Sequence, residues 1–132
     1  MKEFTTEDFL KLLNGIDAMG GNVGTYADRK VDLFKDDDKN LFISTAKVSD
    51  GFKPFETAVG HPEYDGGKLI IVEAYDTKEK AQEGHNKWVK VMTSEVLPDF
   101  LVDCCNNVIC KMLKEKGGNL TFKREKKWKI MT

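Results

Sequence analysis

The chain has 132 residues, of which 40% are hydrophobic and 33% are charged, and its formal net charge is −1. This length predicts one domain over residues 1–132, with a core of modest size under a heavily solvated surface. No apolar run approaches the ~20 residues of a membrane helix, and the early acid at Glu3 does not fit a secretory signal. We therefore expect a soluble protein with no membrane partner.

The first third of the chain has few signals of regular structure. Residues 5–16 predict a short amphipathic helix, with threonines and acids in its first turn. One extended segment is expected within residues 22–31. The Asp-Asp-Asp-Lys-Asn run at residues 36–40 predicts a solvated turn.

Three strands are predicted next, at residues 41–48, 52–59 and 68–75, because these segments are rich in β-formers and separated by turn signals. Pro54 favours an edge position or a late start for the second strand. The apolar run at residues 69–72 predicts a central strand covered on both faces. The three segments predict an antiparallel meander.

Two longer helices are predicted to pack on this sheet. The first opens at Asp76, expected as its cap with Glu79 completing a capping box, and runs to about Met92. The second is expected from about Glu95 to Lys116, with Pro98 in its first turn. Its predicted apolar stripe is Leu97, Leu101, Cys105, Val108 and Met112.

The predicted fold class is therefore α+β: a small antiparallel sheet packed against two longer helices, with a short N-terminal helix. The core module is expected over residues 41–116, and residues 117–132 form a basic segment that supplies either a last strand or an arm. From residue 111 onward the chain holds eight Lys or Arg and two Glu, a charge of +6, which leaves −7 on residues 1–110. Such a split predicts docking on an acidic neighbour, including another copy, or contact with nucleic acid.

No residue pattern predicts catalysis, a metal or a cofactor. Cys104, Cys105 and Cys110 have no CxxC spacing and no histidine nearby in sequence, and we expect buried free thiols in a reducing compartment. His85 is expected to be a packed, hydrogen-bonded helix residue, and His61 a loop residue that caps a turn. The scattered carboxylates of the meander select no acid–base pair.

The basic C-terminal segment is the candidate interaction surface. Its residues are Lys123, Arg124, Lys126, Lys127, Trp128 and Lys129. Basic residues around an aromatic side chain suit a nucleic-acid backbone and a stacked base. The favoured alternative is a final strand whose edge is protected by lysine, with Trp128 turned inward.

Two segments carry a family resemblance: Phe-Glu-Thr-Ala-Val at residues 55–59, and residues 72–89 with the element Ala-Gln-Glu-Gly-His-Asn-Lys-Trp-Val. They resemble a family of short proteins encoded by tailed phages and prophages. Lys80 departs from the pattern, in which an acid is common at that position. The resemblance implies a phage context and no catalytic residues, and we expect Gly84, His85 and Trp88 to be packing residues under the sheet.

The resulting hypothesis is a non-enzymatic phage structural or assembly protein. It is expected to act through protein–protein contacts in a virion or its precursor, as a homo-oligomer or with other phage proteins, in the host bacterial cytoplasm or the virion. The alternative is a host-interaction protein, such as a defence inhibitor that binds a host protein or sequesters a small nucleotide ligand.

Overall fold

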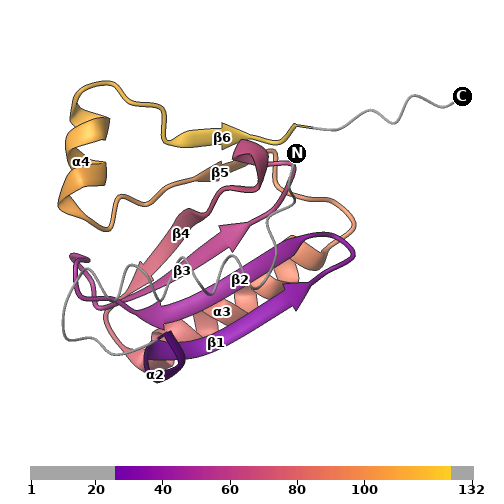
Figure 1. Ribbon diagram of the computed structural model, residues 1–132, viewed down its shortest axis with the longest axis horizontal. Helices are drawn as coiled ribbons and strands as arrows, with labels where there is room; N and C mark the ends of the chain where they lie inside the picture. The colour runs from indigo at the N-terminus through magenta and orange to yellow at the C-terminus, as the bar shows by residue number, and fades with distance from the viewer. Residues whose placement is uncertain (1–25, 126–132) are drawn as a thin grey trace, which may run out of the picture.

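The computed structural model of the protein describes residues 26–125 (Figure 1). In chain order its elements are α2 (Tyr26–Arg29), β1 (Lys30–Asp36), β2 (Leu41–Lys47), β3 (Phe55–Gly60), a 3₁₀ turn (Asp65–Gly67), β4 (Ile70–Tyr75), α3 (Lys78–Thr93), β5 (Phe100–Val102), α4 (Val108–Glu115) and β6 (Thr121–Lys123). The α+β class is confirmed. The helix expected at residues 5–16 lies outside the described residues.

The main sheet has four antiparallel strands in the order β1-β2-β3-β4, so the predicted meander is present with one strand more than expected. The additional strand is β1, which overlaps the extended segment expected within residues 22–31 by only two residues. The solvated turn at residues 36–40 joins β1 to β2. Asp36 Oδ1 accepts the backbone N–H of Asp38, and Asn40 adopts a left-handed φ of 54°, which asparagine tolerates in turns.

The prediction of a central strand at residues 69–72 is wrong, because β4 is the last strand of the main sheet. The strand buried on both faces is β2, in which only Lys47 is exposed. The apolar run has another origin. Ile70 packs in the core between sheet and helix, and the outer edge of β4 is covered by the chain after β5, where Cys104 N–H donates to the Ile71 carbonyl at 2.8 Å.

The first long helix is present as α3, which lies across one face of the main sheet (Figure 1). Its cap is Thr77, whose Oγ1 accepts the backbone N–H of Lys80 at 3.2 Å, so the expectation of Asp76 as the cap is wrong by one residue. Both residues suit a cap. The helix begins at Lys78, so the backbone N–H of Lys80 has no partner within the helix, and Thr77 is the residue three positions before it.

The prediction of a second long helix is wrong. Residues 100–102 form β5, which pairs with β6, and the helix is only α4. Leu101 is 1% exposed while Phe100 and Val102 are 52% and 51% exposed, the alternation of a strand and not a helical face. Cys105 has a φ of 56°, which a helix interior does not allow. The predicted end of the helix at the Gly117-Gly118 pair is confirmed, because Gly117 has a φ of 82° just after α4.

The core lies between α3, the main sheet and the short β5–β6 sheet. Its buried members are Leu41, Ile43, Val59, Tyr64, Ile70, Met92 and Leu101. Tyr64 is fully buried, and its hydroxyl donates to the carbonyl oxygen of Pro98, which ties the loop after β3 to the chain that enters β5. Among residues 26–125, no helix has the length and apolar character needed to cross a membrane.

Candidate functional site

The motif residues of α3 face the sheet. Gly84 lies against the ring of Tyr75, and a Cβ at this position would overlap the Oη, Cε1 and Cζ atoms of that ring. His85 is 2% exposed, and Trp88 is partly buried against the core. This close approach explains why α3 carries a glycine in its interior despite the cost in helix propensity.

A buried hydrogen-bond chain connects these residues to the sheet. His85 Nδ1 and Thr45 Oγ1 are 2.8 Å apart, and Thr45 Oγ1 and Thr57 Oγ1 are 2.6 Å apart. On the other ring edge, His85 Nε2 lies 3.8 Å from Asp32 Oδ2. Burial lowers the pKa of His85, and Asp32 opposes that effect, so the imidazole is neutral at pH 7.

The same chain continues to Glu73. Tyr75 Oη lies 3.0 Å from Thr57 Oγ1 and donates to Glu73 Oε1 at 3.0 Å. That carboxylate also accepts the indole N–H of Trp88 at 3.0 Å and the ammonium of Lys87 at 2.6 Å. Three donors on one carboxylate lower the pKa of Glu73 despite its partial burial.

The order hydroxyl, imidazole, carboxylate in Thr45, His85 and Asp32 is that of a nucleophile–base–acid triad. Thr45 is 0% exposed and His85 is 2% exposed, so a substrate has no access to the hydroxyl. The hydroxyl is also engaged by Thr57. The arrangement therefore holds α3 on the sheet through satisfied buried polar groups.

The predicted basic surface is only partly described. Lys123 is exposed on β6, whereas Arg124 forms an ion pair in which its Nε lies 2.8 Å from Glu63 Oε1, with both side chains less than a quarter exposed. Lys126, Lys127, Trp128 and Lys129 lie outside residues 26–125. His61 is buried, and its Nδ1 accepts the backbone N–H of Glu63 at 3.0 Å, as expected of a turn-capping histidine.

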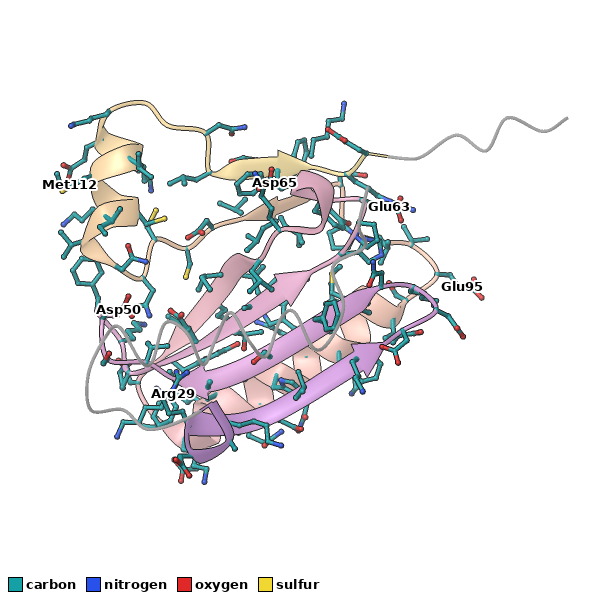
Figure 2. All side chains as sticks on the ribbon, viewed as in Figure 1. Arg29, Asp50, Glu63, Asp65, Glu95 and Met112 are labelled. Carbon is teal, nitrogen blue, oxygen red and sulfur yellow. The ribbon has the colours of Figure 1, made fainter. Side chains whose placement is uncertain are left out.

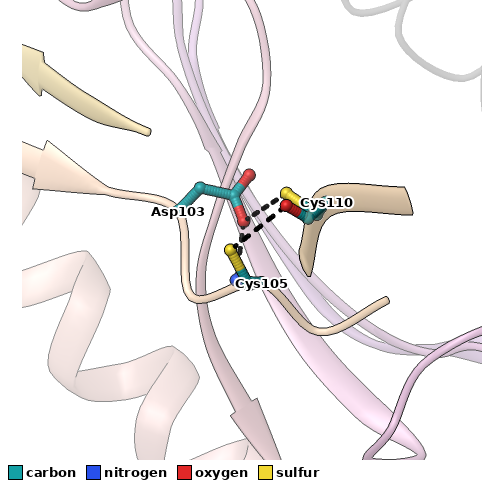
Figure 3. Close-up of side chains that lie close together, drawn as sticks. All are labelled: Asp103, Cys105 and Cys110. Atoms are coloured by element: carbon teal, nitrogen blue, oxygen red, sulfur yellow. Dashed lines mark hydrogen bonds between the residues drawn. The ribbon is translucent and has the colours of Figure 1, made fainter. Parts of the chain in front are cut away.

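The three cysteines are not buried, contrary to expectation: Cys104 is exposed, and Cys105 and Cys110 are partly exposed. The expected burial depended on the long helix that the chain does not form. Instead the turn between β5 and α4 brings the thiols of Cys105 and Cys110 to the carboxylate of Asp103 (Figure 3). The two sulfur atoms and one carboxylate oxygen all lie within 4.8 Å of one another.

Local backbone interactions build this cluster. The N–H of Asp103 donates to the Leu120 carbonyl at 2.8 Å, which holds the start of the turn against the residue that precedes β6. Asp103 Oδ1 then accepts the N–H of Cys105 at 2.9 Å and the thiol of Cys110 at 3.3 Å. Asn107 caps α4 by accepting the N–H of Cys110 at 2.8 Å, which fixes that thiol in the first turn of the helix.

Two thiols of this region, those of Cys104 and Cys110, are protonated at neutral pH. Partial shielding of the sulfur from water and the hydrogen bond to Asp103 raise the pKa of Cys110 to about 12. Partial shielding and the nearby Asp103 carboxylate raise the pKa of Cys104 to about 11. Since the thiolate is the reactive form, neither cysteine is an activated nucleophile. Sequence spacing missed the cluster, whose only signal is the Asp-x-Cys turn at residues 103–105 followed by the Asn107 cap.

A second feature is the surface of α4, which has no buried residue. The α4 surface consists of four large apolar side chains, each between 49% and 73% exposed: Val108, Ile109, Met112 and Leu113. Figure 2 places Met112 at one end of the molecule and Glu95 at the opposite end. No family model, curated protein or solved structure matches this chain.

Proposed function

We propose that this protein is a non-enzymatic phage structural or assembly protein that acts through contacts between its own copies in a virion or its precursor. The observation that supports the contacts is the exposed α4 surface. An eight-residue helix is not stable alone in water, and α4 buries no side chain against the rest of residues 26–125. Contiguous exposed apolar side chains of this kind mark interaction sites.

The charge distribution favours a head-to-tail contact. The α4 surface is bordered by Lys111, Lys114 and Lys116. The opposite end of the long axis holds Glu95 next to Val96, which is 81% exposed, together with the acidic turn between β1 and β2 (Figures 1 and 2). Contacts between two different surfaces of identical subunits generate rings or filaments, which are the forms that virion assembly uses.

The test is the oligomeric state by light scattering over a range of protein concentrations. Ile109 is 73% exposed, so Ile109→Glu places a charge in the contact without disturbing the core and is expected to give monomers. Lys80→Glu, on an exposed position of α3, is the matched control and is expected to leave the oligomer intact. A wild-type protein that is monomeric at every concentration, and is absent from purified particles by mass spectrometry, contradicts the proposal.

A charge exchange tests the head-to-tail arrangement. Lys114→Glu and Glu95→Lys are each expected to weaken association a few-fold, because exposed ion pairs contribute about 0.2–1 kcal/mol. The double variant restores opposite charges at every contact and is expected to recover the wild-type association. If the double variant loses as much association free energy as the two single variants lose together, the head-to-tail geometry is contradicted. Stable co-purification with a host protein, with no self-association, supports the host-interaction alternative.

A further inference from the structure

The cluster of Asp103, Cys105 and Cys110 has the composition of a metal site. Two thiols and one carboxylate are a ligand set for zinc and other thiophilic divalent cations, whereas magnesium and calcium prefer oxygen ligands alone. The three groups come from the eight residues 103–110, which form the turn after β5 and the first turn of α4, and they converge on one point (Figure 3).

The spacing of the ligand atoms fits a small cation. Around a tetrahedral zinc ion, with Zn–S near 2.3 Å and Zn–O near 2.1 Å, neighbouring ligand atoms are about 3.5–3.8 Å apart. Cys110 Sγ and Asp103 Oδ1 are 3.3 Å apart, and no pair in the cluster exceeds 4.8 Å. These separations are close to the spacing of ligand atoms in a tetrahedral zinc site.

The backbone around the cluster is also held in place before any ion binds. Cys105 adopts the left-handed conformation, with a φ of 56°, which is uncommon for a residue with a side chain. This conformation turns the chain so that Cys105 and Cys110, five residues apart, meet on the same side of Asp103. Cys104, which lies next to Cys105 in sequence, is exposed and is not part of the cluster.

We propose that Asp103, Cys105 and Cys110 bind one zinc-class divalent cation per chain, with the fourth coordination position open to water. On binding, the two thiol protons are released to solvent, two metal–sulfur bonds and one metal–oxygen bond form, and the Cys110 hydrogen bond to Asp103 is replaced. No oxidation or reduction occurs. The ion links Asp103, at the end of β5, to the first turn of α4 and so restricts the position of this helix relative to β5. Metal binding does not depend on the assembly role proposed above.

The experiment titrates the full-length, metal-free protein, kept reduced with a phosphine, with Co²⁺ and then Zn²⁺. Co²⁺ is expected to give a thiolate-to-metal absorption band in the near ultraviolet and intense visible bands of a tetrahedral site, and one equivalent of Zn²⁺ is expected to remove both. Zn²⁺ is also expected to raise the melting temperature, because it binds the folded chain preferentially.

Matched variants decide which residues bind. Cys105→Ser and Cys110→Ser are each expected to lower Zn²⁺ affinity at least ~100-fold, and Asp103→Asn about 10-fold, since each removes one of three ligands. Cys104→Ser is the control and is expected to stay within ~2-fold of wild type. Melting of each variant in chelator establishes that it is folded. Absence of the cobalt bands in folded wild-type protein, or equal loss of affinity in Cys104→Ser and Cys105→Ser, overturns the proposal.

Discussion

The contact between Gly84 and Tyr75 makes a prediction that runs against helix propensity. In an exposed helix interior, Gly→Ala stabilises by about 1 kcal/mol. At Gly84 the new methyl group would overlap the ring of Tyr75, which is 7% exposed. The ring has little freedom to move, because its hydroxyl is held by Thr57 and Glu73, each at 3.0 Å. Gly84→Ala must therefore displace the ring or α3.

The net effect follows from these opposing contributions. Overpacking costs about 1–3 kcal/mol, and disturbing the two Tyr75 hydrogen bonds costs about 1 kcal/mol each. After subtracting the gain of about 1 kcal/mol in propensity, Gly84→Ala is expected to destabilise the fold by about 2–4 kcal/mol. For a chain of this length the corresponding fall in melting temperature is about 6–15 °C.

The assay is thermal and urea unfolding followed by circular dichroism. Glu83→Ala, on the exposed neighbour of Gly84, is the control for alanine in this turn of α3 and is expected to change stability by less than about 0.5 kcal/mol. In a Tyr75→Leu background the ring is absent, so the cost of Gly84→Ala is expected to shrink or reverse. A Gly84→Ala protein as stable as wild type refutes the reasoning.

Three further outcomes are expected. Burial lowers the pKa of His85 below its usual 6.5, so the unfolded chain takes up a proton at a higher pH than the folded chain does. The free energy of unfolding is therefore expected to fall as pH drops through about 6.5, by up to ~1.4 kcal/mol per pH unit. His85→Gln should reduce this slope in thermal melts recorded from pH 8 to 5.5. Burial raises the pKa of Glu56, which means that the fold disfavours the charged carboxylate. Glu56→Gln removes the charge but keeps an acceptor for Asn106, and it should stabilise the fold at pH 7 by roughly 0.5–1 kcal/mol. A lower melting temperature of this variant would argue against the reasoning. Leu101→Ala should cost about 2–5 kcal/mol and Val102→Ala less than about 1, measured by urea unfolding; equal costs would contradict the strand at β5.

Several parts of the fold were predictable because short-range signals determine them. The Asp-rich turn at residues 36–40, the strand start at Leu41 and the helix end before Gly117 depend on residues within a few positions of one another. The starts expected at residues 52 and 68 are observed at Phe55 and Ile70. In α3 the spacing of Ala81, His85, Trp88 and Met92, which face the sheet, indicates a helix, and the Asp-Thr pair before it places the cap to within one residue. The packing positions of Gly84, His85 and Trp88 follow from the same spacing.

The second helix failed because its period was ambiguous. Leu97, Leu101 and Cys105 repeat every four residues, which fits a helix, but Phe100, Leu101 and Val102 are also strong β-formers. The ambiguity is resolved by β6, a partner about 20 residues away, which pairs with Leu101 through Phe122. Local propensity contains no information about such a partner.

By itself, the sequence determined the α+β class, the antiparallel meander, the capped helix α3 and the split between acidic body and basic C-terminal segment, because composition, period and turn chemistry are local properties. Only the tertiary structure decided that β2 is the buried strand, that Gly84 accommodates Tyr75, and that α4 exposes its apolar side. It also decided that Asp103, Cys105 and Cys110 meet, because a left-handed residue and a helix cap bend the chain at a point where spacing alone predicted a straight helix.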